Sequence, residues 1–327
     1  MKVHLIAVQA ELRLANYRTP EAFAAWILEL SQRAVADLDD APKLLAFPET
    51  VGLPLVLTLP HYAEVSRRHL SGAVLTVLRR EWRAVVGAAV THWAFGPSAL
   101  FVAQALATYR AYVDAFSAAA QQTGATIVAG SSFLPQVEHE PSRGLHVADG
   151  KVHNVSYTFS PTGSILGRSA KRYLTAGLES CLGLTRAAPE SLKVLETPAG
   201  RVGVALCLDG FYSSVLETFD GLGTQVIVQP SANYAPWTRR WPPDHAYSEG
   251  EAWLGLGLRA GVRGRQYIRY GINPMLVGGV FGLQAEGRTS IVANSRYTDA
   301  ETEGYGGVLA LAETYDREEI IRATVTL

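Results

Sequence analysis

The sequence has little net charge and little of the compositional bias that marks several classes of protein. Its 327 residues include 29 Lys and Arg against 30 Asp and Glu, which gives a formal net charge of -1. Without a basic surplus the chain has no general attraction to phosphate, so nucleic acid is not expected as a partner. The 48% hydrophobic content excludes a disordered chain, and the 30 glycines do not follow a collagen repeat.

Cysteine is also scarce, because the chain contains only Cys181 and Cys207. Two cysteines cannot form a disulfide framework, so we expect a reducing compartment and a cytoplasmic location. Residues 1–9 lack the features of a signal peptide and are predicted to form a buried strand. No stretch of about 18 residues is free of charged or strongly polar side chains, so neither a membrane span nor a membrane partner is predicted.

Several common catalytic signatures are missing. The sequence has no Gly-Lys-Ser/Thr, no G-x-S-x-G, no H-E-x-x-H and no C-x-x-C. These absences argue against a phosphate-binding loop, a serine nucleophile elbow and the usual zinc motifs. His146 and His153 are the closest histidine pair, but neither has a second ligand at a spacing typical of metal sites. No metal is therefore predicted.

Short apolar runs rich in β-branched residues predict strands buried in a sheet, at 3–8, 43–47, 125–129, 152–159, 202–206 and 225–229. Helical patterns lie between several of them, at 20–37, roughly 97–123 and 212–222. This alternation predicts a layered α/β fold. Turn residues at 160–163 and 197–200 predict two hairpins, so the sheets should be mixed. No linker or repeat is visible, and a single domain over 1–327 is expected.

Residues 57–120 form an enlarged segment that is predicted to be mostly helical. It is rich in Ala, Leu and Val, and its Arg and Glu residues are spaced as in amphipathic helices. Surface helices packed on the sheet are one interpretation. A cap over an active site or a contact between subunits is the other.

Three ionisable residues stand where apolar runs end. Glu49 follows the run 44–47 and Pro48, which favours an extended approach and ends strand pairing. It should therefore lie at the carboxyl edge of a strand, where open α/β folds bind ligands. Lys171 lies in the run 168–174, and Glu179 follows it eight positions later. A solvated glutamate and a surface lysine are the structural alternatives.

Cys207 ends the run 203–206, and Asp209 could cap the helix predicted after it. A cysteine at a helix N-terminus is expected to favour the thiolate. An inert core cysteine is the alternative, since cysteine is often buried. Cys181 has no such strand before it and is interpreted as structural.

Taken together, these residues supply a nucleophile, a base and a cation without any histidine. The combination and its chain order resemble the nitrilase or carbon–nitrogen hydrolase superfamily. The family's F-P-E sequence is matched by 47–49, and its lysine pattern by Lys171, Leu174 and Glu179. Its cysteine motif G-[VI]-x-[IVL]-C-x-[DE] is matched by 203–209. Similar sequences at 226–233 and 319–323 extend the resemblance over most of the chain.

The resemblance implies a four-layer αββα sandwich that forms a homodimer or a larger assembly and needs no cofactor. It implies that Cys207 attacks a small amide or nitrile, that Glu49 is the general base, and that a thioester is then hydrolysed. Lys171 and the backbone N–H of Leu208 would stabilise the oxyanion. Glu179 would orient the site and contact the substrate.

The substrate is less well defined by the resemblance. Nitrilases of the family favour C-W-E at the nucleophile, whereas this chain has Cys207-Leu208-Asp209, which favours an amide. Departures from the family pattern lie at 237–253, at 263–268 and in the long gap after the F-P-E motif. The residues expected to support the site or bind substrate are Phe211, Tyr212, Asn233 and Trp237. A nitrilase, acyl transfer to an amine and a noncatalytic binding protein on the same fold stay open as alternatives.

Overall fold

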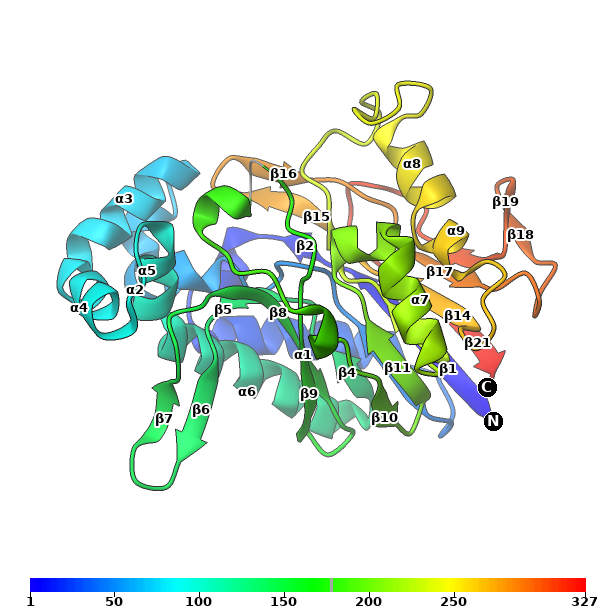
Figure 1. Cartoon of the computed structure of the whole chain (residues 1–327), viewed down its shortest axis with the longest axis horizontal. Helices are drawn as coiled ribbons and strands as arrows, with labels where there is room; N and C mark the ends of the chain where they lie inside the picture. The colour runs from blue at the N-terminus through cyan, green and yellow to red at the C-terminus, as the bar shows by residue number, and fades with distance from the viewer. Residues whose placement is uncertain (177–178) are drawn as a thin grey trace.

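Two β-sheets pack face to face in the computed structural model of the chain, and helices cover the outer face of each sheet (Figure 1). The structure describes residues 1–176 and 179–327. The first sheet has the spatial order β21 (Glu319–Thr326), β1 (Lys2–Gln9), β3 (Lys43–Ala46), β4 (Thr126–Val128), β8 (His153–Phe159) and β5 (Ser132–Leu134), with β9 (Ile165–Ala170) paired to β8. The second has the order β10 (Leu195–Thr197), β11 (Gly200–Val204), β12 (Val226–Val228), β14 (Tyr270–Asn273), β17 (Ser290–Ala293) and β20 (Val308–Leu311).

The side chains of β1 alternate between two cores. Val3, Leu5 and Ala7 pack between the two sheets, whereas Ile6 and Val8 pack under the helices of the first outer layer. That layer consists mainly of α1 (Pro20–Val35) and α6 (Ala105–Thr123), which contact each other. A strand buried on both faces has no polar side to show, which is why this one is a continuous apolar run.

The second sheet is built in the same way. Val226 and Val228 of β12 face the first sheet, and Ile227 faces the opposite outer layer. That layer contains α7 (Ser213–Gly221) and α9 (Leu258–Val262), with α8 (Glu249–Leu256) beside α9. The order helix, sheet, sheet, helix confirms the predicted αββα sandwich.

Both predicted hairpins are present, as β8 with β9 and β10 with β11. Strands β1, β3 and β4 are parallel, as are β11, β12 and β14, so each sheet is mixed as predicted. Smaller pairings were not predicted from the sequence. They are the sheet of β13 (Ser231–Ala232), β15 (Met275–Val280), β16 (Leu283–Ala285) and β2 (Glu11–Leu12), and the hairpins β6 (Val137–Glu140) with β7 (Gly144–Val147) and β18 (Glu301–Thr302) with β19 (Tyr305–Gly306).

The helical segment 57–120 is divided into separate helices instead of forming one long stretch. They are α2 (Leu55–Val65), α3 (Leu70–Arg80), α4 (Trp82–His92), α5 (Pro97–Ala103) and α6. Of these, α6 belongs to the outer layer, whereas α3 and α4 lie at one end of the molecule, in cyan in Figure 1. In the described residues no single helix is long and apolar enough to cross a membrane. The pair α4 and α5 passes that test only when taken together, and it is bent by 100°.

Glycine is required where the chain leaves β4 and passes behind the turn after β3. Gly130 has φ +68°, a conformation that L-residues adopt only at a cost, and a Cβ there would lie 2.0 Å from the carbonyl oxygen of Pro48. The next residue, Ser131, accepts the backbone N–H of Thr50 on its Oγ at 2.9 Å. This contact between the two loops fixes the position of the backbone that carries Glu49.

Replacing Gly130 by Ala should therefore lower the free energy of unfolding by about 3 kcal/mol or more, because the backbone of residue 48 must move. Gly124→Ala is the matched control: its φ is +61° and a Cβ there meets nothing within 4 Å, so only the conformational cost of about 1 to 2 kcal/mol applies. Urea denaturation measures both. Equal losses in the two variants would contradict this account of the loop.

Candidate active site

Residues from three separate strand ends meet in one buried site. Glu49 follows β3 and Lys171 follows β9, both in the first sheet, while Cys207 follows β11 in the second. The exposed fractions of these residues are 3%, 1% and 6%. The site therefore lies where the carboxyl-terminal ends of β3 and β11 meet, and it requires both sheets.

The Lys171 ammonium group lies between two carboxylates. Its Nζ is 2.8 Å from Oε1 of Glu49 and 2.8 Å from Oε2 of Glu179. Glu179 is itself 3% exposed and also accepts the backbone N–H of Thr175 at 2.8 Å. Burial alone would lower the pKa of Lys171, but the charges of Cys207, Glu49 and Glu179 outweigh it and hold that pKa well above the usual value.

Asn154 completes this charge cluster, and the sequence analysis did not identify it as a site residue. Its Nδ2 donates to Oε1 of Glu49 at 2.8 Å and to Oε1 of Glu179 at 2.7 Å. Asn154 is fully buried in β8. A fully polar amide in an otherwise apolar strand was the available signal, since buried polar groups need partners.

The turn at Cys207 has an unusual backbone. Cys207 has φ +48°, which is uncommon for a residue with a side chain. Its N–H donates to the carbonyl of Pro230 at 2.9 Å, and its carbonyl accepts Nε2 of Gln229 at 2.6 Å. A Cβ at Gly210 would lie 2.3 Å from the Gln229 side chain, so glycine makes room for this contact. The turn is thus held in position from both sides.

Asp209 does not cap the following helix, as the sequence analysis expected. Its carboxylate accepts the backbone N–H groups of Arg172 and Tyr173, with the shortest distance 2.7 Å. The next helix, α7, receives no side-chain cap. Asp209 instead links the turn of Cys207 to the loop of Lys171, because those two N–H groups have no strand partner to bond.

The expected thiolate at Cys207 is also not what the surroundings favour. Burial raises the pKa of Cys207 well above its usual value, and the negative charge of Glu49 raises it further, against the effect of Lys171. Burial likewise raises the pKa of Glu49. The thiol hydrogen bonds to the Glu49 carboxylate. The resting site therefore holds a protonated thiol beside a carboxylate that can accept its proton.

The other residues expected to support the site occupy different surroundings. Tyr212 is 40% exposed and stacks on Tyr173 with ring centroids 3.5 Å apart, whereas Phe211 packs edge-on against Trp253. Asn233 bonds within its own loop, through Ala235. Trp237 packs with Leu254 and Met275. Leu208 is half-buried in the short 3₁₀ helix Cys207–Phe211.

Tyr234, in contrast, lies close to the catalytic charges. Its hydroxyl is 2.9 Å from Oγ1 of Thr50, the neighbour of Glu49. Burial raises the pKa of Tyr234 to about 12, with smaller contributions from the charges of Glu49 and Cys207. Its phenol is therefore a neutral group at the wall of the site.

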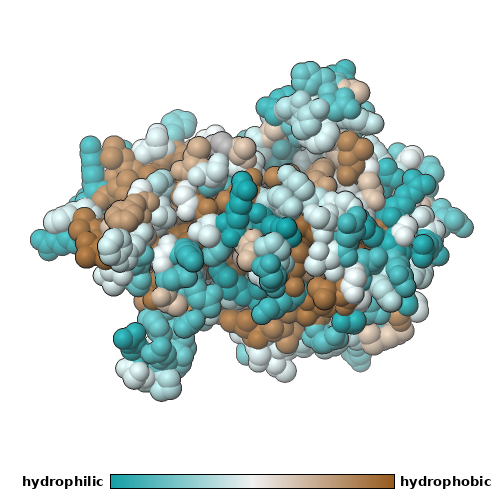
Figure 2. All heavy atoms as spheres, viewed as in Figure 1, coloured by the Kyte–Doolittle hydropathy of each residue, from teal (hydrophilic) through white to brown (hydrophobic). Residues whose placement is uncertain are grey.

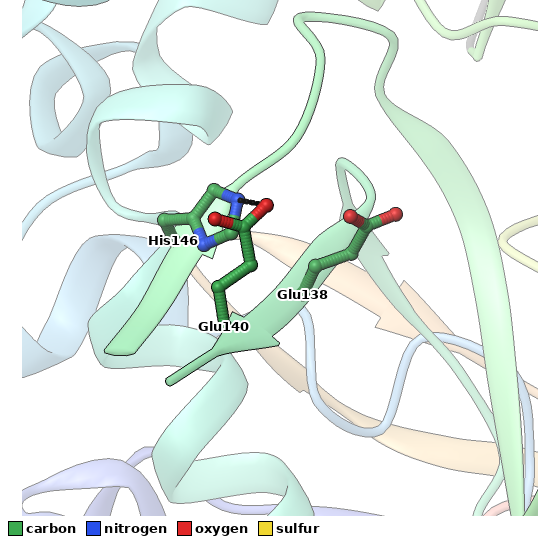
Figure 3. Close-up of side chains that lie close together, drawn as sticks. All are labelled: Glu138, Glu140 and His146. Carbon is green, nitrogen blue, oxygen red and sulfur yellow. Dashed lines mark ion pairs between the residues drawn. The ribbon is translucent and has the colours of Figure 1, made fainter. Parts of the chain in front are cut away.

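One cluster of possible metal ligands lies apart from this site, on the hairpin of β6 and β7 (Figure 3). Strand pairing sets Glu138 opposite His146, and the ligand atoms of Glu138, Glu140 and His146 lie within 4.8 Å of one another. The sequence offered no second ligand for His146, because this hairpin was not predicted. Glu140 already pairs with His146 at 3.7 Å and with Arg143 at 4.0 Å.

A family model described as carbon–nitrogen hydrolase matches residues 7–252. This chain belongs to the carbon–nitrogen hydrolase family. It is accordingly an enzyme of that class, and the resemblance noted in its sequence is confirmed. A search of curated proteins found no match.

Solved structures of this carbon–nitrogen hydrolase fold resemble the chain along its whole length. A carbon–nitrogen hydrolase from Helicobacter pylori G27 has a TM-score of 0.61 at 17% identity, covering 99% of this chain and 88% of that one. An amidase from Nesterenkonia sp. has 0.60 at 14%, covering 99% and 90%. Saccharomyces cerevisiae Nit3, of branch 10 of the nitrilase superfamily, has 0.57 at 17%, covering 99% and 89%. At these identities the likeness shows the shared fold.

Burial raises the pKa of Asp209 to about 6, although the N–H groups of Arg172 and Tyr173 oppose the shift. The folded protein therefore keeps a proton that the unfolded chain releases between about pH 4 and 6. Relative to Asp209→Asn, the wild type should lose about 1 to 3 kcal/mol of stability as the pH rises through that window. Urea denaturation at several pH values measures the difference.

Asp220→Asn is the control for this titration. Burial would raise the pKa of Asp220, but three backbone N–H groups outweigh it and lower that pKa. The stabilisation from Asp220 is then complete above about pH 4 and is lost only at lower pH. Its difference from the wild type should stay constant above pH 5. A constant difference for Asp209→Asn as well would contradict the raised pKa.

Proposed function

We propose that this enzyme hydrolyses a small, non-peptide amide through a thioester on Cys207, releasing ammonia or an amine and an acid. The observation that carries the proposal is the buried contact of Lys171 with both Glu49 and Glu179, each at 2.8 Å, beside the Cys207 thiol. Such a cluster supplies a nucleophile, a base and a cation in one place excluded from water.

The first step is attack of the Cys207 sulfur on the amide carbon. The raised pKa of the thiol means that its proton leaves as the bond forms, and it passes to the Glu49 carboxylate to which the thiol hydrogen bonds. Glu49 then gives this proton to the leaving nitrogen, and the C–N bond breaks. With the thioester formed, Glu49 again accepts a proton, now from the attacking water, and Cys207 leaves as the thiol.

Negative charge develops on the amide oxygen during both steps. The Lys171 ammonium is one donor for it, and the backbone N–H of Leu208 is the other. Among the described residues this N–H has no acceptor, as expected for the first turn of a short helix. Loss of one such donor typically costs about 3 kcal/mol in the barrier.

An amide is favoured over a nitrile because the residue two positions after the nucleophile is Asp209. Its carboxylate is occupied by the N–H groups of Arg172 and Tyr173, so it fixes the lysine loop without entering the chemistry. In one related structure, an amidase from Nesterenkonia sp. AN1 carries the acetamide moiety of fluoroacetamide on its active site cysteine. That precedent supports a cysteine nucleophile that accepts amide compounds. The homodimer, like the cytoplasmic location, stays a prediction.

Ammonia release from a panel of amides, N-carbamoyl compounds and nitriles tests the proposal. Cys207→Ala should abolish release while its unfolding transition stays close to that of the wild type, because only a buried sulfur is lost. Cys181→Ala is the control, since Cys181 is exposed and should be dispensable. Release that survives in Cys207→Ala would exclude the thioester. Release from nitriles alone would replace the amidase by a nitrilase, and new amide products with added amines would indicate acyl transfer.

Glu49→Gln keeps the shape of the side chain and removes the base. Turnover should fall by at least about 100-fold. Because burial raises the pKa of Glu49, wild-type kcat/KM should rise with pH above the usual carboxyl range, and residual activity of the variant should lack this rise. Glu313→Gln, on the surface, is the control. An unchanged pH profile in Glu49→Gln would move the base to another residue.

A further inference from the structure

Helix α4 exposes an apolar face that the αββα sandwich does not use. Trp82, Val86 and Val90 recur every four residues, so they share one side of the helix, and they are 55%, 52% and 73% exposed. Trp93 and Phe95 follow directly, are 80% and 66% exposed, and contact each other. These five residues are called the α4 apolar face below. Figure 2 shows hydrophobic side chains gathered at the end of the molecule where α3 and α4 lie.

The rest of the chain does not cover this face. A different side of α4, with Ala84, Gly87 and Thr91, lines a cavity of about 460 Å³ that it shares with Arg143 and His146 of the β6–β7 hairpin region. The hairpin thus packs beside α4 on that other side. Contiguous exposed apolar residues of this kind mark an interaction surface.

The surroundings of the α4 apolar face are basic, unlike the chain as a whole. Residues 66–95 include five arginines and one glutamate, and no acidic residue follows until Asp114. The arginines are Arg67, Arg68, Arg79, Arg80 and Arg83, all exposed. The single Glu81 accepts a hydrogen bond from His61, so it offers these arginines no free carboxylate. The region therefore presents a local positive charge.

We propose that α3 and α4 dock this enzyme on the surface of a lipid bilayer that carries anionic headgroups. Helix α4 would lie in the plane of the interface, with Val86 and Val90 toward the acyl chains and Trp82 and Trp93 at the headgroup level, where indole rings are enriched. The arginines would contact the anionic headgroups. The contact is peripheral, because residues 98–102 of α5 are buried in the protein and the pair α4 and α5 is bent by 100°.

A second copy of the chain is a poorer occupant of the same face. A two-fold contact through α4 would bring Arg79, Arg80 and Arg83 of one copy close to the same residues of the other. Like charges brought together in this way oppose association, and no acidic residue of α3 or α4 would offset them. An anionic bilayer supplies the opposite charge over the whole surface.

Co-sedimentation of the full chain with vesicles tests this proposal. Binding to vesicles of phosphatidylcholine mixed with phosphatidylglycerol should exceed binding to phosphatidylcholine alone by about tenfold and should weaken as salt is added. The double variant Trp82→Ser, Val90→Ser should lose most of the binding, and so should Arg79→Glu, Arg83→Glu. Because all four side chains are exposed, ammonia release in free solution should be unchanged.

Leu222→Ser with Tyr297→Ser is the matched control. These two side chains are 44% and 43% exposed but lie far along the chain from α4, so their loss should leave vesicle binding intact. Equal binding to neutral and anionic vesicles, or undiminished binding in the α4 variants, would overturn the proposal. So would a wild type that ignores vesicles and forms a dimer that Trp82→Ser, Val90→Ser dissociates in sedimentation equilibrium.

Discussion

The buried ammonium group of Lys171 is the interaction on which the active site depends. Two carboxylates, Glu49 and Glu179, lie within the protein and away from water, where an unpaired charge costs several kcal/mol. Lys171 contacts both at 2.8 Å, and Asn154 donates to both from the other side. The three ionised groups are tolerable there only as a set, so the positions of their loops are mutually constrained.

The same constraint links the two sheets. Glu49 and Lys171 follow strands of the first sheet, but Oε2 of Glu49 accepts the N–H of Ala232, which follows a strand of the second. Asp209, beside the nucleophile, accepts N–H groups from the lysine loop. Packing of apolar residues between the sheets brings these loops together, and hydrogen bonds then fix their spacing. The chemistry is thus a property of the sheet pair and not of either sheet alone.

The site and the α4 apolar face are organised by opposite rules. At the site, polar groups are buried and each charge has a partner, which is the condition for a reactive thiol to sit beside a base without solvent. On α4, apolar groups are exposed and the nearby charges are of one sign. Both depart from the usual arrangement of a globular protein, and in both the departure identifies a surface that something else is expected to contact.

Much of this protein was determined by its sequence alone. Apolar runs specified the strands, because a strand buried on both faces has no polar side, and the residues at their ends identified Glu49, Lys171 and Cys207. The spacing of local motifs could not reveal Asn154 or the true partners of Asp209, since those hydrogen bonds join segments that are distant along the chain. Nor could it reveal that the thiol is protonated, because the pKa of Cys207 depends on burial and on charges contributed by other strands. Local sequence thus decided which residues carry the chemistry, and only tertiary packing, which sets distance and dielectric, decided how they share their protons.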